Sequence, residues 1–320
     1  MSETGATLTV GLAQIDCRPG DPDANLAHHL EWVERARAAG VDLLVFPELS
    51  LTGYRLLHLT PRLARRVAGD PDLARLAAAA GPMAVLAGLV EEGEDGRIFN
   101  SAVLLGGAGG SGADSAGQAF VHRKLYLPTY GLFQEGRFFR PGSRLAAAPL
   151  AAAGAAGFGI LVCEDLWHPH LAGRLAAAGV RLLAVPSAGP GRLGPGPVPP
   201  SHESWELVTR STALLNATWV LYCNRVGWEE GTFYSGGSHV VRPGGEVLAR
   251  APFLEEHLLT VTIDLREADR LRWRLPLLAD ERADVQGVVR ELEERDPAAS
   301  LFGPAGSTGP ARSPGSGDGR

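Results

Sequence analysis

The stretch GFGILVCEDLWHP, residues 157–169, decides how the rest of the chain is interpreted. Its apolar run at residues 158–162 is typical of a buried strand, which we expect to end at Cys163. Pro169 does not allow a helix to continue through that point, although one can begin there. A cysteine held at such a strand end can direct its sulfur into a pocket, where backbone N–H groups of the turn face a developing oxyanion. The other interpretation is a small cysteine buried in the core.

The composition is that of a globular protein. Of 320 residues, 45% are hydrophobic and 21% are charged, and the net charge is −6, which does not favour a dedicated nucleic-acid-binding protein. Three cysteines are too few for a disulfide framework, and no CxxC or HxxxH pair suggests a metal site. The N-terminus lacks signal-peptide features, and no apolar run is long enough to span a membrane. We therefore expect a cytoplasmic protein without a metal or cofactor, and without a nucleic-acid or membrane partner.

Alternating strands and helices predict an α/β fold. Residues 8–15, 25–39 and 41–46 have the patterns of a strand, a helix and a second strand, which together make one βαβ unit. The strand at 158–162, with a helix at 170–179 and a strand at 180–185, makes a second unit. The other predictions are a helix or helix pair at 61–80, strands at 83–90, 99–105 and 119–122, a helix at 202–215, a strand at 219–223, a turn at 224–231, a hairpin of 235–241 and 246–250, a strand at 258–263 and a helix from 264 to 271.

Three segments are expected to lie outside the packed core. Residues 106–117 are rich in Gly, Ser and Ala and predict a mobile hairpin tip. Residues 276–302 form a C-terminal extension whose charged part, 280–295, has a helical pattern. Residues 303–320 consist mostly of Gly, Pro, Ser and Arg, and we expect them to be disordered.

Glu48, Lys124 and Cys163 each follow an apolar strand. The carboxyl ends of strands are where α/β sheets usually place ligand-contacting groups. Apolar neighbours would raise the pKa of Glu48 and suit it to proton transfer, and an ammonium at Lys124 would stabilise an oxyanion or lower the pKa of a thiol. A base, a cation and a thiol are the parts that acyl transfer through a thioester needs. Alternatively, Glu48 is a surface carboxylate and Lys124 is a solvated lysine.

Three motifs around these residues resemble those of the nitrilase, or carbon–nitrogen hydrolase, superfamily. The glutamate motif is FPELSLTGY, the lysine motif is HRKLYLPTYGLFQEGRFF and the cysteine motif is VCEDLWHP. They occur in the family's order, and the resemblance covers residues 8–264. It implies a four-layer αββα sandwich, here at residues 1–275, that forms a dimer or a higher homo-oligomer.

The resemblance also implies roles for the residues. Cys163 would be the nucleophile, Glu48 the general base and Lys124 the group that stabilises the tetrahedral intermediate, with the backbone N–H after Cys163 completing the oxyanion hole. Glu135 resembles the family's second glutamate, which positions substrate or the lysine; an exposed loop carboxylate is the alternative. The implied reaction is hydrolysis of a non-peptide amide bond in a small molecule through a thioester at Cys163, with release of ammonia or an amine. Nitrile hydrolysis is less expected.

Within the superfamily, the sequence resembles the glutaminase domain of glutamine-dependent NAD synthetases. In that branch, the residues matching Tyr54, Tyr130, Glu164 and Trp167 line the glutamine pocket. Two departures from that branch matter, and the second stands against glutamine specificity. We expect no synthetase domain with an ATP-binding loop after the charged segment, and Gly189 occupies the place of the serine that would hold the glutamine head group.

Several alternatives stay open at this point. The protein could be a glutaminase subunit that delivers ammonia to a separate synthetase, an acyltransferase in which an amine replaces water, or a non-catalytic interaction protein with the same fold. His168 and His170 are interpreted as structural, and Arg192 as either a ligand for a substrate carboxylate or a solvated loop arginine. Cys17 and Cys223 are interpreted as core thiols.

Overall fold

The computed structural model describes residues 7–106, 119–150, 153, 157–192, 196 and 198–280. The described residues up to Leu278 belong to one compact unit. The hairpin tip predicted at 106–117 lies outside the described residues from residue 107 onward, as do the extension from residue 281 and the tail at 303–320.

The first sheet has six strands in the order β13-β1-β2-β3-β4-β5. The central strands β1, β2 and β3 are parallel, and the outer pairings are antiparallel. The parallel part includes the predicted N-terminal βαβ unit. The strands are β1 (Thr7–Gln14), β2 (Leu43–Val45), β3 (Ala84–Glu92), β4 (Ile98–Leu105), β5 (Phe120–Arg123) and β13 (His257–Asp264).

The second sheet has five strands in the order β12-β11-β8-β7-β6. Strands β6, β7 and β8 are parallel, as the second predicted βαβ unit requires, and β11 and β12 continue the sheet in antiparallel pairing. The strands are β6 (Gly159–Ile160), β7 (Leu182–Ser187), β8 (Trp219–Asn224), β11 (His239–Val241) and β12 (Val247–Arg250).

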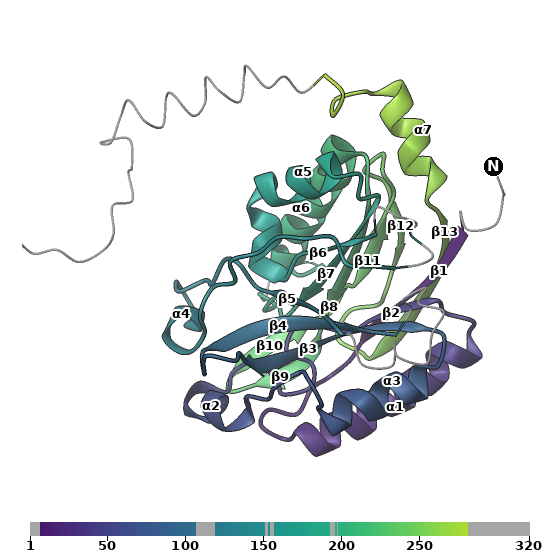
Figure 1. The fold of residues 1–320 in the computed structure, drawn as a ribbon. Coiled ribbons are helices and arrows are strands. Elements are labelled where there is room, and N and C mark those ends of the chain that lie inside the picture. The colour runs from purple at the N-terminus through teal and green to yellow at the C-terminus, as the bar shows by residue number, and fades with distance from the viewer. Residues whose placement is uncertain are drawn as a thin grey trace, which may run out of the picture. The chain divides into compact units, whose positions relative to one another are not determined.

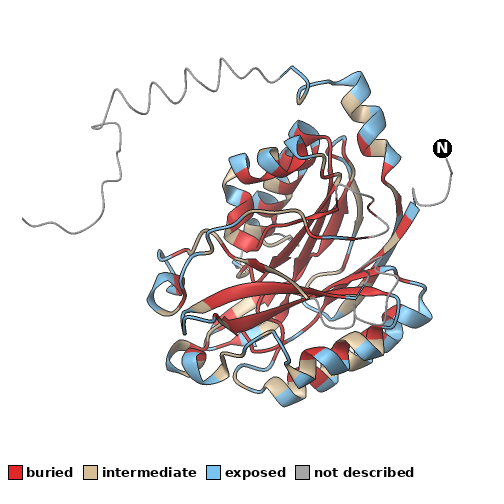
Figure 2. Cartoon of the chain, in the orientation of Figure 1, coloured by how far each residue is buried: buried red, intermediate tan, exposed pale blue. Residues whose placement is uncertain are grey.

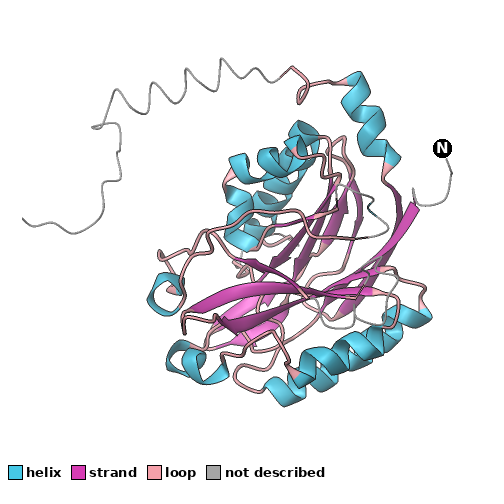
Figure 3. Cartoon of the chain, viewed as in Figure 1, coloured by secondary structure: helices cyan, strands magenta, loops and turns pink. Residues whose placement is uncertain are grey.

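Helices cover the outer faces of both sheets (Figures 1 and 3). Helices α1 (Pro22–Ala38) and α3 (Pro71–Ala80) contact each other over the first sheet, and α5 (Pro169–Ala177) and α6 (Pro200–Asn216) contact each other over the second. Each of the four has a proline in its first turn, where the missing N–H is not needed. The result is the expected four-layer αββα sandwich.

The remaining helices are short or lie near the end of the described chain. They are η1 (Leu57–Leu59), α2 (Thr60–Leu63), α4 (Glu135–Phe138), η4 (Cys163–Trp167) and α7 (Arg266–Arg274). Among the described residues, no helix combines the length and apolar character needed to cross a bilayer.

The core lies between the two sheets and beneath the helices (Figure 2). Every residue of β2, β7 and β8 is buried, because these strands are covered on both faces. This explains why they appear in the sequence as continuous apolar runs rather than as alternating patterns. Strand β1 contacts β8 across the interface between the sheets.

Two sequence predictions differ from the structure. The turn predicted at 224–231 is wrong: β9 (Val226–Glu229) pairs with β10 (Thr232–Ser235) in a separate two-stranded sheet. Its polar residues suggested a turn, but Glu229 is buried and paired with Arg225. The strand predicted at 158–162 pairs with β7 only at Gly159–Ile160, while Phe158 forms an isolated bridge with Ala148 and residues 161–162 remain buried.

Candidate active site

A buried ion-pair cluster lies at the ends of the first sheet's strands. The Lys124 ammonium donates to Glu48 Oε1 and to Glu135 Oε1, both at 2.7 Å. All three side chains are at most 3% exposed. Lys124 directly follows β5, and its backbone N–H donates to the Asn100 carbonyl on β4, which fixes its place beside the sheet. The structure thus brings together two of the three predicted strand-end residues, and the predicted second glutamate with them.

Glu48 is held from both sheets. It lies in the turn after β2, and the Asn100 amide on β4 donates to its Oε1 at 2.7 Å. Its Oε2 accepts the backbone N–H of Ala188 at 2.9 Å, immediately after β7 of the second sheet. These contacts orient a carboxylate that is 1% exposed.

Cys163 begins the η4 turn after β6 and has a left-handed backbone, with φ of 48°. A non-glycine residue adopts this conformation rarely and at a cost, so the surrounding structure has to hold it in place. The residue is 5% exposed. Its thiol lies close enough to Glu48 and Lys124 for their charges to act on its pKa.

Asp165 joins the loops that carry Cys163 and Lys124. One carboxylate oxygen accepts the backbone N–H groups of Leu125 and Tyr126, both at 2.9 Å. The other accepts the N–H of Val162 at 3.1 Å and lies 3.0 Å from His122 Nε2. Asp165 is fully buried, so these contacts satisfy a carboxylate that would otherwise be costly to desolvate. It therefore ties the cysteine turn to the lysine strand.

The electrostatics of the cluster favour a protonated thiol at rest. Burial, followed by the Glu48 carboxylate, raises the pKa of Cys163, while Lys124 opposes that rise. Burial lowers the pKa of Lys124, but Glu135 and Glu48 outweigh it, and the pKa lies well above its ordinary value. Burial also raises the pKa of Glu135 to about 7, against the opposing effect of Lys124. The thiol therefore needs a base when it reacts.

The predicted substrate-contacting residues form two groups. Tyr54 donates its hydroxyl to Glu135 Oε1 at 2.5 Å, so it belongs to the buried cluster. Tyr130 is 59% exposed and donates to both oxygens of Glu164, at 2.9 and 3.0 Å. Trp167 is 42% exposed and packs edge-on against Trp205. Tyr130 and Trp167 are thus exposed and Glu164 is half-buried, and contact of these residues with a substrate stays a prediction.

Other residues singled out from the sequence have different surroundings. His168 stacks on Tyr126, whose hydroxyl lies 3.1 Å from His170 Nε2, so both histidines have the structural contacts expected of them. Cys17 and Cys223 are buried, as predicted. Arg192 is exposed.

Sequence reasoning did not select Asn100 or Asp165. Asp165 follows another acidic residue and has no neighbourhood that distinguishes it, and Asn100 lies within a strand. A buried polar residue inside an apolar strand was the available signal for Asn100.

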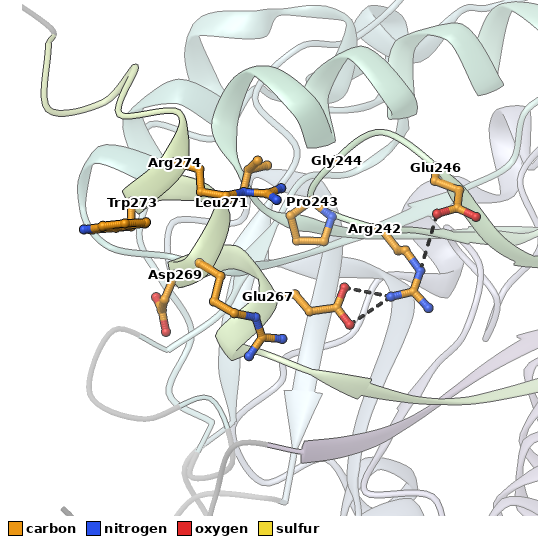
Figure 4. A pocket seen from close by; sticks show the side chains of 10 residues that line it. Arg242, Pro243, Gly244, Glu246, Glu267, Asp269, Leu271, Trp273 and Arg274 are labelled. Atoms are coloured by element: carbon orange, nitrogen blue, oxygen red, sulfur yellow. Dashed lines mark hydrogen bonds and ion pairs between the residues drawn. The ribbon is translucent and has the colours of Figure 1, made fainter.

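An open hollow of about 700 Å³ lies elsewhere, between α7 and the β11–β12 turn (Figure 4). Arg242 lies there between Glu246 and Glu267. None of the cluster residues described above lines it. Among the described residues, no group of three or more His, Cys, Asp or Glu side chains is placed to hold a metal ion.

Residues 9–272 match the carbon–nitrogen hydrolase family. The chain belongs to this family. A glutamine-dependent NAD(+) synthetase of Thermotoga maritima is 33% identical over 264 residues, which are 81% of this chain and 42% of the relative. A protein of Pseudomonas protegens described as a hydrolase in the pqqF 5′ region is 32% identical, over 87% of this chain and 90% of its own length.

A solved carbon–nitrogen hydrolase relative supports the fold. The amidase from Nesterenkonia sp. AN1, in a mutant showing covalent addition of the acetamide moiety of fluoroacetamide at its active-site cysteine, is 26% identical with a TM-score of 0.69. The match covers 89% of this chain and 98% of the amidase. The expected family and fold are therefore confirmed, and the likeness to NAD synthetases spans less than half the length of the synthetase cited above.

Proposed function

We propose that this protein is a cysteine-dependent amidase that hydrolyses a small, linear amide and releases ammonia or an amine. The observation that carries the proposal is the buried Lys124 ammonium, bonded to Glu48 and Glu135 next to the Cys163 thiol. The covalent modification of the active-site cysteine in the Nesterenkonia amidase supports the same chemistry here.

The first step forms a thioester. Glu48 accepts the thiol proton while the sulfur attacks the amide carbon, and the carbonyl oxygen takes up the displaced electron pair. Lys124 and the backbone N–H of Glu164 stabilise that oxyanion, because buried donors that already point at the oxygen do not have to reorient during the reaction. The thiol is protonated at rest, so base removal of its proton is required for attack.

The second step releases the products. The intermediate collapses, the C–N bond breaks and Glu48 gives its proton to the departing nitrogen, which leaves as ammonia or an amine. Glu48 then takes a proton from water as the water oxygen attacks the thioester. Collapse of this second intermediate breaks the C–S bond and releases the acid, and Glu48 returns the proton to the sulfur. Glu135 holds the Lys124 ammonium in place through both steps.

Ammonia release from a panel of ω-amides, carbamoyl compounds and simple amides tests the proposal. Cys163→Ala is expected to lower kcat by about a thousandfold or more, because no other group can form the thioester. Cys17→Ala, a second buried thiol outside the cluster, serves as the matched control and should retain turnover. Full turnover by Cys163→Ala would show that the mechanism is wrong.

A second candidate is an ammonia-donating subunit for a separate synthetase. The 33% identity to a glutamine-dependent NAD(+) synthetase, of which this chain spans 42%, favours it. Glutaminase activity should then rise when the separately encoded synthetase is added with its substrates. Glutaminase activity that does not respond to the synthetase would count against this role.

A further inference from the structure

We infer that Glu229, held by Arg225, is a positioning residue of the active site: it fixes the Tyr54 backbone and thereby keeps the Tyr54 hydroxyl on Glu135. The inference rests on the proposed amidase function and deepens it by naming a further residue on which the reaction depends. Glu229 acts through Tyr54 rather than on the substrate, and the contacts between them can be followed one by one.

The β9–β10 hairpin holds the segment that carries Tyr54. Glu229, the last residue of β9, accepts the Tyr54 backbone N–H at Oε1, 2.9 Å away. The next residue, Arg55, donates to the Thr232 hydroxyl on β10 at 3.2 Å, and its Nε lies 3.5 Å from a carboxylate oxygen of Glu230. The segment is therefore attached to the hairpin at two consecutive residues.

A glycine beside Tyr54 leaves room for this attachment. Gly53 has a left-handed backbone, with φ of 85°. A Cβ atom there would lie 2.9 Å from Glu229 Oε1, the oxygen that accepts the Tyr54 N–H, and 2.6 Å from the Pro19 Cα. A side chain at position 53 would therefore displace the carboxylate from the Tyr54 backbone.

Glu229 accepts from three donors with its two oxygens. Its Oε2 accepts the Arg225 guanidinium at 3.0 Å and the Tyr234 hydroxyl at 3.1 Å, and its Oε1 accepts the Tyr54 N–H. The Glu229 and Arg225 side chains are fully buried, and Arg225 is also fixed by the Cys17 carbonyl at 2.9 Å. A carboxylate accepts at both oxygens, whereas a glutamine amide accepts at only one. Only an acid satisfies all three donors here.

The Tyr54 hydroxyl carries this order to the catalytic cluster. It donates to Glu135 Oε1 at 2.5 Å, the oxygen that also accepts the Lys124 ammonium. Burial, followed by the charges of Glu135 and Glu48, keeps the pKa of Tyr54 well above its ordinary value, so the hydroxyl remains a donor. The polar and titratable groups that face Glu135 are Lys124, Glu48, Tyr54 and the Asn100 amide.

The hydrogen bond from Tyr54 favours the ionised form of Glu135. Burial raises the pKa of Glu135 to about 7, while Lys124 and the Tyr54 hydrogen bond act against that rise. Loss of the bond should therefore raise the pKa further. Since an ionised Glu135 holds Lys124 in place, a displaced Tyr54 should change the pH range over which the enzyme works.

The pH profile of kcat/KM for ammonia release, with an amide that the wild type hydrolyses, tests this contact. The wild-type value should fall as the pH drops through the pKa of Glu135, which is about 7. Tyr54→Phe should move the midpoint of that fall to higher pH by about one unit, because the ionised carboxyl loses a donor. A purely structural loss would lower kcat/KM at every pH and leave the midpoint in place.

Variants of Glu229 test its role in the same measurement. Glu229→Gln should move the midpoint in the same direction by about half a unit or more, and the double variant with Tyr54→Phe should shift no further than Tyr54→Phe alone. Glu229→Asp keeps a charge for Arg225 on a shorter side chain, and it should shift the midpoint in the same direction even if Glu229→Gln does not fold. Glu91→Gln, at another buried carboxylate paired with an arginine, Arg123, is the matched control and should leave the midpoint unchanged.

The outcomes distinguish the inference from the proposed function. An unchanged midpoint in the folded Glu229 variants, or a double-variant shift equal to the sum of the single shifts, would overturn the inference and leave the amidase proposal standing. The titration of Glu135, followed by NMR of isotopically labelled carboxyl groups and assigned with Glu135→Gln, needs no turnover. If no amide releases ammonia and Cys163 forms no adduct, the amidase function is wrong, and this titration still decides whether Glu229 positions Tyr54.

Discussion

Glu135 uses one carboxylate oxygen for two partners. Its Oε1 accepts the Lys124 ammonium at 2.7 Å and the Tyr54 hydroxyl at 2.5 Å. Burial raises the pKa of this carboxyl to about 7, so its charge changes near neutral pH. When it takes up a proton, Lys124 loses one of its two anionic partners. The lysine's position, and the oxyanion stabilisation that depends on it, should therefore follow the state of Glu135.

This predicts an acid limb in the pH profile of kcat/KM. The pKa is raised in the folded protein, so the carboxyl is ionised above about pH 7 and neutral below it. Wild-type kcat/KM should fall as the pH drops through about 7. Glu135→Gln should have a lower kcat/KM that lacks this limb between pH 6 and 8. If kcat/KM of Glu135→Gln falls over the same pH range as that of the wild type, a group other than Glu135 causes the fall.

At the residue scale, the sequence predicted the site residues that lie in recognisable motifs directly after strands. Glu48 and Lys124 do form the buried pair that their strand-end positions suggested, and Cys163 lies beside them. Asn100 and Asp165 were missed because their importance lies in tertiary contacts, with Glu48 in one case and with the lysine loop in the other. The local sequence does not contain that information.

At the scale of elements, the turn that carries Glu48 is pressed against strand β3. A Cβ atom on Gly88 would lie 2.2 Å from the Leu49 nitrogen and 2.8 Å from the Pro47 oxygen. Leu49 already has a left-handed backbone, with φ of 50°. The turn therefore has little freedom to move aside, and its shape depends on a glycine in the neighbouring strand.

Gly88→Ala is expected to displace the Glu48 turn and lower kcat/KM about a hundredfold, because a shift of about 1 Å at a catalytic group has effects of this size. Gly244→Ala is the matched control, since a Cβ there meets nothing within 4 Å. Circular dichroism should show that both variants fold. Wild-type activity in folded Gly88→Ala would contradict this account of the turn.

Elements were predictable where one local pattern dominated. The apolar runs of β7 and β8 predicted strands close to those observed, because burial on both faces requires apolar residues throughout. The β9–β10 pair was not predictable. Its polar residue Glu229 pairs with Arg225, four residues earlier, but also accepts the backbone N–H of Tyr54, which is distant in the sequence.

At the scale of the whole molecule, side chains of the second sheet bond to the first. The Trp219 indole donates to the Asp264 carbonyl at the end of β13, 3.1 Å away. The Cys223 thiol, on the same strand, donates to the Val45 carbonyl on β2 at 3.2 Å. Both side chains are fully buried, so these contacts form part of the packing between the sheets.

Trp219→Phe should therefore reduce the free energy of unfolding by about 1 to 3 kcal/mol, from a lost hydrogen bond and a small cavity. Urea unfolding monitored by circular dichroism measures this change. Trp273→Phe, at a position that is 85% exposed, is the matched control and should change it by less than about 0.5 kcal/mol. Equal effects at the two positions would contradict the packing argument.

The central claim is that Cys163 is the one nucleophilic thiol of an amidase site. Intact-protein mass spectrometry after incubation with fluoroacetamide, followed by peptide mapping, tests it most directly. The account predicts a single adduct on the peptide that contains Cys163, and none in Cys163→Ala. Labelling of Cys17 or Cys223 instead, or equal labelling of Cys163→Ala, would contradict it.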